Sequence, residues 1–126
     1  MLNDAEAIAT IPVKDADKAR SFYRDTLGLR TLDDRDGVAT YRSGESKVFV
    51  YESEHAGTNE ATAATWVTDD VDATVRHLKT KGVSFEHYPD LPGLKIEGDI
   101  HVADDGDMRV AWFKDPDGNI LSIVSG

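Results

Sequence analysis

Histidines and a surplus of carboxylates are the side chains of this chain that could bind a metal ion or move a proton. A metal-binding helix would show a spacing such as His-Glu-x-x-His, and no histidine of this sequence stands in one. An isolated histidine is usually a surface or hydrogen-bonded residue. Two of them, His87 and His101, flank the segment 89–98 and are the ones retained as candidates at a cleft. The four histidines are His55, His77, His87 and His101.

Other catalytic patterns are missing from the sequence. It holds no cysteine, no Ser/His/Asp elbow and no glycine-rich phosphate loop. Ser122 falls in a predicted strand without an identifiable base, so it is not assigned as a nucleophile. Catalytic residues therefore stay unassigned at this stage.

The element that organises the chain is the stretch 110–124, two β-rich runs around Asp-Pro-Asp-Gly-Asn. Pro116 fixes φ for a turn, and Gly118 supplies a positive φ without steric cost. Asp115 and Asp117 can accept hydrogen bonds from the turn amides. The stretch predicts a strand, a tight turn and a second strand.

The first half of the chain reads as one strand, one helix and three strands. Asp15 is placed to cap the helix and Gly28 to end it. Apolar residues recur at spacings of three and four between these two positions, as in an amphipathic helix. The predicted strands are 5–14, 29–32, 38–42 and 47–53, the helix is 16–27, and the turns are 33–37 and 43–46.

The second half repeats this order after a small, polar linker at 54–61. Asp69 or Asp70 begins the second helix, and Gly82 ends it. The remaining predictions are strands at 62–68 and 83–88, a loop at 89–98, an extended segment at 100–103, a turn at 104–107 and the final hairpin.

An offset of 55 positions superimposes the two halves, so that Asp15 meets Asp70 and Asp17 meets Asp72. The shared order of elements indicates an internal duplication. Each half has a sheet face that it cannot bury alone, so the halves must pack together or close over a cavity. We expect one domain, 1–126, with module one at about 5–55 and module two at about 62–126.

The composition limits the classes of molecule that the protein could bind. Fourteen basic and 24 acidic residues give a net charge of −10, which argues against a nucleic-acid or anionic-membrane partner. No apolar run approaches the roughly 20 residues of a membrane-spanning helix. The acidic N-terminus does not read as a signal peptide, so a cytoplasmic protein is expected.

Two motifs about ninety residues apart, together with the repeat, resemble the vicinal oxygen chelate superfamily. They are Phe22–Leu29 and Phe113–Asn119. That superfamily includes glyoxalase I, bleomycin-resistance proteins, fosfomycin-resistance enzymes and extradiol dioxygenases. The segment 85–95 is also similar to its glyoxalase-like subgroup. The resemblance implies an α+β fold of two βαβββ modules, a half-open mixed β-barrel around a cleft, and usually a homodimer.

The resemblance also implies where a metal ion would be bound in this family. The ligand positions are seven residues before each helix-capping Asp, which are Ile8 and Ala63, and four after the turn glycine, which is Ser122. A fourth falls at about Val50, or at Glu52 with the same strand parity. Because aliphatic side chains cannot ligate, the family's metal site is expected to be missing, and no cofactor is predicted.

An apolar cleft floor with aromatic surroundings suits a small, partly flat organic molecule. Trp112 and Phe113 must point to opposite faces, and the sequence does not say which one faces the cleft. The candidates for the ligand cleft are Ile8, Tyr41, Val50, Glu52, Ala63, His87, Trp112 and Ser122.

Three functions are compatible with these residues. The favoured one is a metal-independent protein that binds a small apolar or amphipathic compound. The alternative is an enzyme, either a glyoxalase-like lyase or isomerase or a dioxygenase-type enzyme with displaced metal ligands, or a metal-free one using Ser122, Tyr41 or His87. The third is a dimeric accessory protein with a vestigial cleft.

Overall fold

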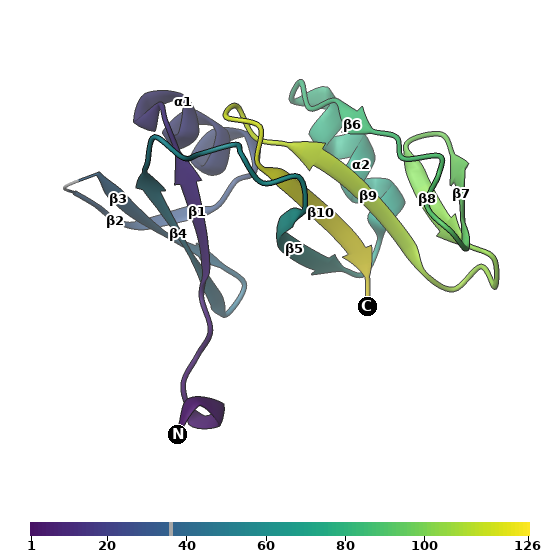
Figure 1. The fold of residues 1–126 in the computed structure, drawn as a ribbon, viewed down its shortest axis with the longest axis horizontal. Helices are drawn as coiled ribbons and strands as arrows, with labels where there is room; N and C mark the ends of the chain where they lie inside the picture. The colour runs from purple at the N-terminus through teal and green to yellow at the C-terminus, as the bar shows by residue number, and fades with distance from the viewer. Residues whose placement is uncertain (36) are drawn as a thin grey trace.

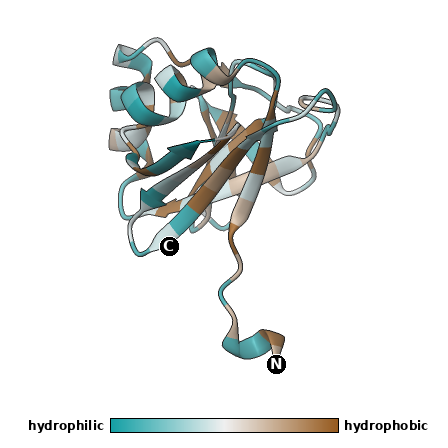
Figure 2. Ribbon diagram, turned by 90° about the vertical axis from the view of Figure 1, so that its left-hand side faces the viewer, coloured by the Kyte–Doolittle hydropathy of each residue, from teal (hydrophilic) through white to brown (hydrophobic). Residues whose placement is uncertain are grey.

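The computed structural model describes residues 1–35 and 37–126, and it has the predicted α+β architecture of two sheets with a helix packed on each. The sheets lie side by side and do not close (Figure 1). Both helices cover the same side of the sheets and leave the other side open (Figure 2). We call the uncovered side the open face.

Sheet one has the strand order β1-β4-β3-β2. β1 pairs with β4 in parallel, and the other pairs are antiparallel. Pro12 is tolerated in β1 because this strand lies at the edge of the sheet. The strands are β1 (Ala9–Val13), β2 (Arg30–Arg35), β3 (Val38–Ser43) and β4 (Ser46–Glu52).

Sheet two has the order β5-β10-β9-β8-β7, and β6 also pairs with β9. Its centre is the predicted hairpin, in which β9 and β10 are antiparallel, while β5 joins β10 in parallel. The strands are β5 (Thr62–Thr68), β6 (Phe85–Glu86), β7 (Leu94–Glu97), β8 (Ile100–Ala103), β9 (Arg109–Lys114) and β10 (Ile120–Ser125).

Both helices begin at the predicted caps. The Asp15 carboxylate accepts hydrogen bonds from the amides of Asp17 and Lys18, both at 3.1 Å, and α1 (Ala16–Arg20) follows. This helix continues as a π-helical stretch (Ser21–Thr26) and stops before Gly28, which has φ = 74°. The carboxylate of Asp70, not of Asp69, caps α2 (Val71–Thr80) by accepting from the Ala73 amide at 3.0 Å.

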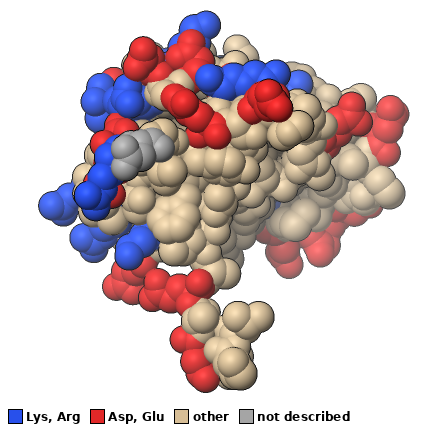
Figure 3. Space-filling view, turned by 60° about the vertical axis from the view of Figure 1, so that its left-hand side comes forward, with Lys and Arg blue, Asp and Glu red and all other residues tan. Residues whose placement is uncertain are grey.

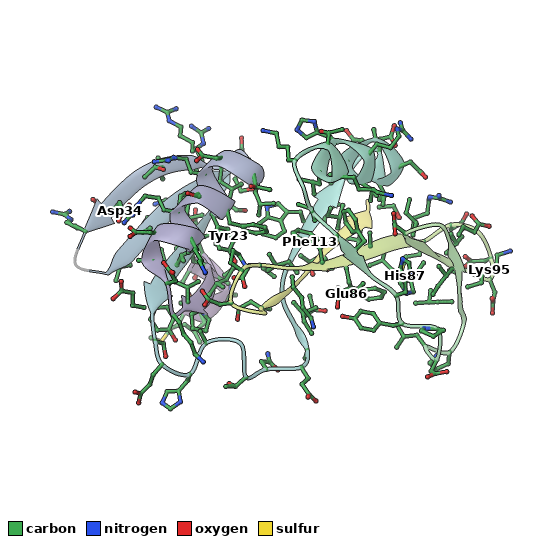
Figure 4. All side chains as sticks on the ribbon, turned by 90° about the horizontal axis from the view of Figure 1, so that it is seen from above. Tyr23, Asp34, Glu86, His87, Lys95 and Phe113 are labelled. Atoms are coloured by element: carbon green, nitrogen blue, oxygen red, sulfur yellow. The ribbon has the colours of Figure 1, made fainter. Side chains whose placement is uncertain are left out.

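The core lies between the helices and the sheets, where α2 packs its apolar face onto sheet two. Phe113 and Leu121 are at most 1% exposed there. Tyr23 from α1's extension and Phe113 from β9 both lie toward the middle of the molecule, one from each module (Figure 4). Phe22 bridges them, with ring centroids 5.2 Å from Tyr23 and 6.3 Å from Phe113.

A buried polar cluster, which we call the seam, fastens the two modules together. The Tyr23 hydroxyl donates to Asp115 at 2.6 Å, and burial, followed by the charge of Asp115, raises the pKa of this tyrosine. The other oxygen of Asp115 accepts from the amides of Asp117 and Asn119, which confirms the expected turn chemistry for Asp115. The Asp117 carboxylate does not do the same: within the described residues its buried Oδ2 has no hydrogen-bond partner. The Asn119 side-chain amide donates to Asp115 and to the Pro12 carbonyl, so the hairpin turn is bonded to β1.

Four sequence predictions of local structure need correction. The strand predicted at 5–14 is only β1, Ala9–Val13, because the residues before it belong to the N-terminal arm. β2 continues through Arg35, where a turn was predicted, and a bulge near Leu32 accommodates it. The predicted strand 83–88 is only the two residues of β6. The predicted loop 89–98 contains β7, in which Leu94 and Ile96 alternate with charged residues. Prolines and glycines around this alternation made the segment read as a loop.

The first eight residues leave the body as an arm that ends in a short 3₁₀ turn (Leu2–Asp4) (Figures 1 and 2). Leu2 on this arm is 87% exposed. Among the described residues, the helices are too short or too polar to span a bilayer.

Candidate functional site

Strand register decides which side chains of sheet one reach the open face. Val50 is paired with Ile11, and both are buried in the core under α1. Thr10 is paired with Phe49, one residue earlier on each strand. Because side chains alternate along a strand, Thr10, Phe49 and Tyr51 lie on the open face.

Three candidates from sheet one therefore lie on the wrong side for the expected cleft. Tyr41, Val50 and Glu52 line a hollow of about 290 Å³ beneath α1, together with Ala19 and Ala39. Tyr41 is 1% exposed, and its ring centroid lies 6.0 Å from that of Tyr23. The prediction placed Val50 and Ile8 on the same face of the cleft. In the observed register Val50 pairs with Ile11, so Ile8 and Val50 belong to opposite faces of sheet one.

Sheet two resolves the question of Trp112 and Phe113. Phe113 pairs with Leu121 in the core under α2, whereas Trp112 pairs with Ser122. Ser122 in turn pairs with Thr65 on β5. Trp112, Ser122 and Thr65 therefore share the open face of sheet two.

The residues at the family's ligand positions do not fit a metal ion. Ile8 lies half-buried just before β1, and Ala63 lines a hollow of about 300 Å³ with Thr10 and Pro12. The Ser122 hydroxyl is 2.8 Å from the Thr65 hydroxyl and shares a hydrogen bond with it. Within residues 1–35 and 37–126, no three His, Asp or Glu side chains converge as ligands would.

A groove of about 660 Å³ lies beside Trp112, where sheet two's open face meets the linker and the segment after β6. This volume lies within the range of pockets for small organic ligands. It is lined by Glu60, Ala61, Thr62, His87, Tyr88, Pro89, Asp90, Leu91, Trp112 and Ile120.

Two aromatic rings, Trp112 and Tyr88, line the groove, and the buried ring of His101 packs behind them. Trp112 makes edge-to-face contacts with Tyr88, at 5.3 Å between ring centroids, and with His101, at 4.8 Å. His101 is fully buried, and its Nε2 accepts a hydrogen bond of 2.9 Å from the Tyr88 backbone amide. Burial, followed by the nearby His87, lowers the pKa of His101, so the ring stays neutral as this acceptor. His101 therefore fixes the position of Tyr88.

The rest of the wall is held by two further polar contacts. The Trp112 indole N–H donates to Thr62 at 3.1 Å, which joins the base of the groove to β5. At the rim, His87 Nε2 is 2.8 Å from Asp99, which also receives a hydrogen bond of 2.6 Å from Lys79. The hydrogen bonds from these two partners lower the pKa of Asp99, and Lys79 has the larger effect. His87 follows β6 and lies between Glu86 of that strand and Lys95 of β7 (Figure 4).

Sequence reasoning placed Trp112 and His87 in this region and missed the other eight groove residues, four of which matter for the site. Tyr88 carried a signal, since it is aromatic and ends the run before the loop. Thr62, Glu60 and Asp90 carried none, because a threonine in a strand and acidic residues in polar segments are common. Their position depends on the linker and the segment after β6 approaching each other, which is a tertiary contact.

Comparisons with known proteins point to one family. The model of the Glyoxalase/Bleomycin resistance protein/Dioxygenase superfamily matches residues 7–123. The chain is 30% identical to the uncharacterized protein YraH of Bacillus subtilis (strain 168), over 88% of this chain and 90% of that protein.

Two solved structures share the fold. Lactoylglutathione lyase from Agrobacterium tumefaciens superimposes with a TM-score of 0.73 at 18% identity, over 97% of this chain and 93% of that one. TnmS3, an antibiotic binding protein from Streptomyces sp. CB03234, gives a TM-score of 0.65 at 24% identity, over 96% of this chain and 97% of that one.

Proposed function

Since the chain belongs to the Glyoxalase/Bleomycin resistance protein/Dioxygenase superfamily, we propose that it binds a small, partly flat, apolar or amphipathic molecule without the metal ion of that superfamily. The groove beside Trp112 is the proposed site. The observation that carries the proposal is this hollow of about 660 Å³, which has Trp112 and Tyr88 in its wall, both hydrogen-bonded to neighbouring residues.

The preorganised wall supports binding. A guest that lies against Trp112 and Tyr88 gains aromatic contact area at a low ordering cost, because hydrogen bonds already hold the Trp112 indole and the Tyr88 backbone and the two rings pack against each other. TnmS3, which shares the fold, is an antibiotic binding protein. A guest of this kind is therefore compatible with the architecture.

The donor chemistry favours binding over the metal-dependent enzyme. Ile8 and Ala63 have no lone pairs to donate, and the Ser122 hydroxyl is bonded to Thr65. A divalent ion in a catalytic site needs three or more such ligands together with an open position. Elemental analysis of the purified protein checks this directly. A stoichiometric transition metal, with an activity lost on chelation, would replace the proposal with the enzyme.

A fluorescence titration tests the groove. The chain has two tryptophans, so Trp66→Phe leaves Trp112 as the single reporter. Trp66 lies on the core side of β5, where its indole donates to Ser43 at 2.9 Å. We expect flat aromatic compounds to quench Trp112 saturably. In the matched variant Trp112→Phe, the remaining Trp66 should not respond.

A thermal-shift screen measures the same event independently. A ligand at one hundred times its Kd stabilises the native state by about 2.7 kcal/mol. Aromatic compounds that quench Trp112 should therefore also raise Tm. If no member of a broad aromatic library does either, the groove is not a binding site.

We also propose that two copies associate through their open faces and that the protein works in the cytoplasm. Val67 and Tyr51, on the open faces of sheets two and one, are 68% and 36% exposed. The forward side in Figure 3 has a broad area without charged side chains between the charged groups above and the N-terminal arm below. Sedimentation of the wild type and of Val67→Asp tests the association, which the aspartate should weaken.

A further inference from the structure

Building on the proposed function, we infer that the molecule bound beside Trp112 is a cation with an aromatic or other flat apolar body. The site is the whole groove, with aromatic rings on its wall and two carboxylates, Glu60 and Asp90, at its edges. The rings recognise the flat body, and the rings and carboxylates together recognise the positive charge.

The carboxylates come from two separate segments that border the same hollow. Glu60 belongs to the linker before β5, and Asp90 follows Tyr88 and Pro89 on the other side. Within the described part of the chain, neither carboxylate is in an ion pair or accepts a side-chain hydrogen bond. Both are exposed, so their charge acts on a guest that enters between them.

The remaining lining does not cancel this charge. It includes no lysine or arginine among the residues that the structure describes. His87, at the rim, has its Nε2 against Asp99 at 2.8 Å. The field inside the groove is therefore negative, in keeping with the net charge of −10.

Another surface hollow shows that this lining is not shared across the molecule. The hollow beside Pro116, of about 330 Å³, is lined by Lys81 and Lys114 as well as by Glu86. Lys114 pairs with Glu86 at 3.4 Å. There each sign of charge has its opposite nearby, whereas in the described part of the chain no Lys or Arg borders the groove beside Glu60 and Asp90.

The aromatic wall adds a second attraction for a cation. A cation within about 6 Å of the face of an indole or phenol ring is attracted by the negative face of that ring. Trp112 is the best ring for this contact, and it is half-buried, so part of it stays open to the groove. A neutral guest of the same shape would gain the stacking but not these charge terms.

Three probes on one ring system separate shape from charge. They are 2-naphthylmethylammonium, neutral 2-naphthylmethanol and anionic 2-naphthoate, titrated by calorimetry at pH 7.5 and low salt. We expect the cation to bind roughly five- to tenfold more tightly than the neutral probe, since each exposed charge pair contributes modestly. The anion should bind more weakly than either, and about 0.3 M salt should reduce the cation's advantage.

The double variant Glu60→Gln/Asp90→Asn assigns the preference to its cause. It should lower the affinity for the cation roughly three- to tenfold and leave that for 2-naphthylmethanol unchanged. The matched control is Glu6→Gln/Glu45→Gln, which removes the same net charge at exposed positions away from the groove. The control should keep the full preference.

The outcomes separate this inference from the proposed function. Equal affinity for the cation and the neutral probe, or a preference that survives in the groove variant, overturns the cation and leaves the binding function intact. Failure of the cationic probe to bind overturns the inference, and failure of the whole aromatic library, with no quenching of Trp112, overturns the proposed function as well. A preference that is lost in the groove variant and kept in the control supports the inference.

Discussion

The seam and the groove are the two regions where polar and aromatic side chains gather, and they differ in how much bonding capacity they leave free. At the seam, the Asp115 carboxylate is 5% exposed and accepts four hydrogen bonds from Tyr23, Asp117 and Asn119. At the groove, Glu60 and Asp90 stand exposed beside half-buried aromatic rings.

This difference separates scaffold from site. A buried carboxylate whose oxygens are all used stabilises one arrangement of the chain, because losing any donor leaves charge without a partner. Carboxylates and ring faces that are still free can bind something else. Changes at the seam should therefore alter stability, and changes at the groove should alter binding.

The largest effect is expected for Asp115→Ala. It would leave the Tyr23 hydroxyl and the Asn119 side-chain amide buried with fewer partners, at about 1–3 kcal/mol for each unsatisfied group. We expect a loss of at least about 3 kcal/mol in the free energy of unfolding, measured with urea. Asp115→Asn, which keeps the shape and one acceptor, is the control and should lose less. A loss below 1 kcal/mol for the alanine variant would show that the seam is not a scaffold.

Tyr23→Phe should have the next largest effect. It removes only the hydroxyl that donates to Asp115 at 2.6 Å, and hydrogen bonds to charged groups contribute about 1.5–3 kcal/mol. Urea denaturation should show a loss in that range. The Kd for 2-naphthylmethylammonium should stay the same. A changed Kd in a variant that keeps the fold would contradict the separation of the seam from the binding site.

Trp112→Leu should have the opposite effect and change ligand binding more than stability. Removing the indole takes away the main ring of the groove, and we expect about a tenfold weaker Kd for 2-naphthylmethylammonium, which is about 1.4 kcal/mol. The calorimetric control is Trp66→Leu, which changes the other tryptophan on the core side of β5. Should both variants bind the probe as well as the wild type, the ring beside the groove is not part of the site.

The smallest effect is a pH dependence from His101. Its pKa lies below the ordinary value of 6.5 because the ring is buried. The unfolded chain therefore takes up a proton at this residue near pH 6.5, whereas the folded chain does so only at lower pH. Stability is full above pH 6.5 and falls below it until the folded pKa is reached, by at most about 1.4 kcal/mol per pH unit.

Urea denaturation at pH 7.5 and 5.5 measures this term. In His101→Gln, whose amide oxygen can still accept from the Tyr88 N–H, the part of the pH dependence due to His101 should vanish. An identical pH dependence in both proteins would mean that the buried ring is not the group that titrates.

Much of the fold could be predicted from the sequence because its signals are local. The Asp15 cap, the Asp115–Asn119 turn and the repeated order of elements depend on a few neighbouring residues. β7 was missed because Pro92, Gly93 and Gly98 obscured the alternation between them.

The site could be predicted only in part, because it depends on which face each strand turns outward. Alternation along one strand shows which of its residues share a face, but not which face of the sheet that is. For Tyr41 this requires the register between β3 and its neighbouring strands. Tyr41 and Glu52 were therefore assigned to the cleft but lie under α1. Trp112, by contrast, lies on the open face, and only the pairing with Ser122 could show it.

The most direct test of the central claim is a chemical-shift map of ¹⁵N-labelled protein titrated with 2-naphthylmethylammonium. The account predicts saturable shifts at the Trp112 indole N–H and at the backbone amides of Thr62 and Tyr88, with the seam amides of Asp117 and Asn119 unmoved. Shifts confined to Ala19 and Ala39, in the hollow beneath α1, or no saturable shift at all, would contradict it.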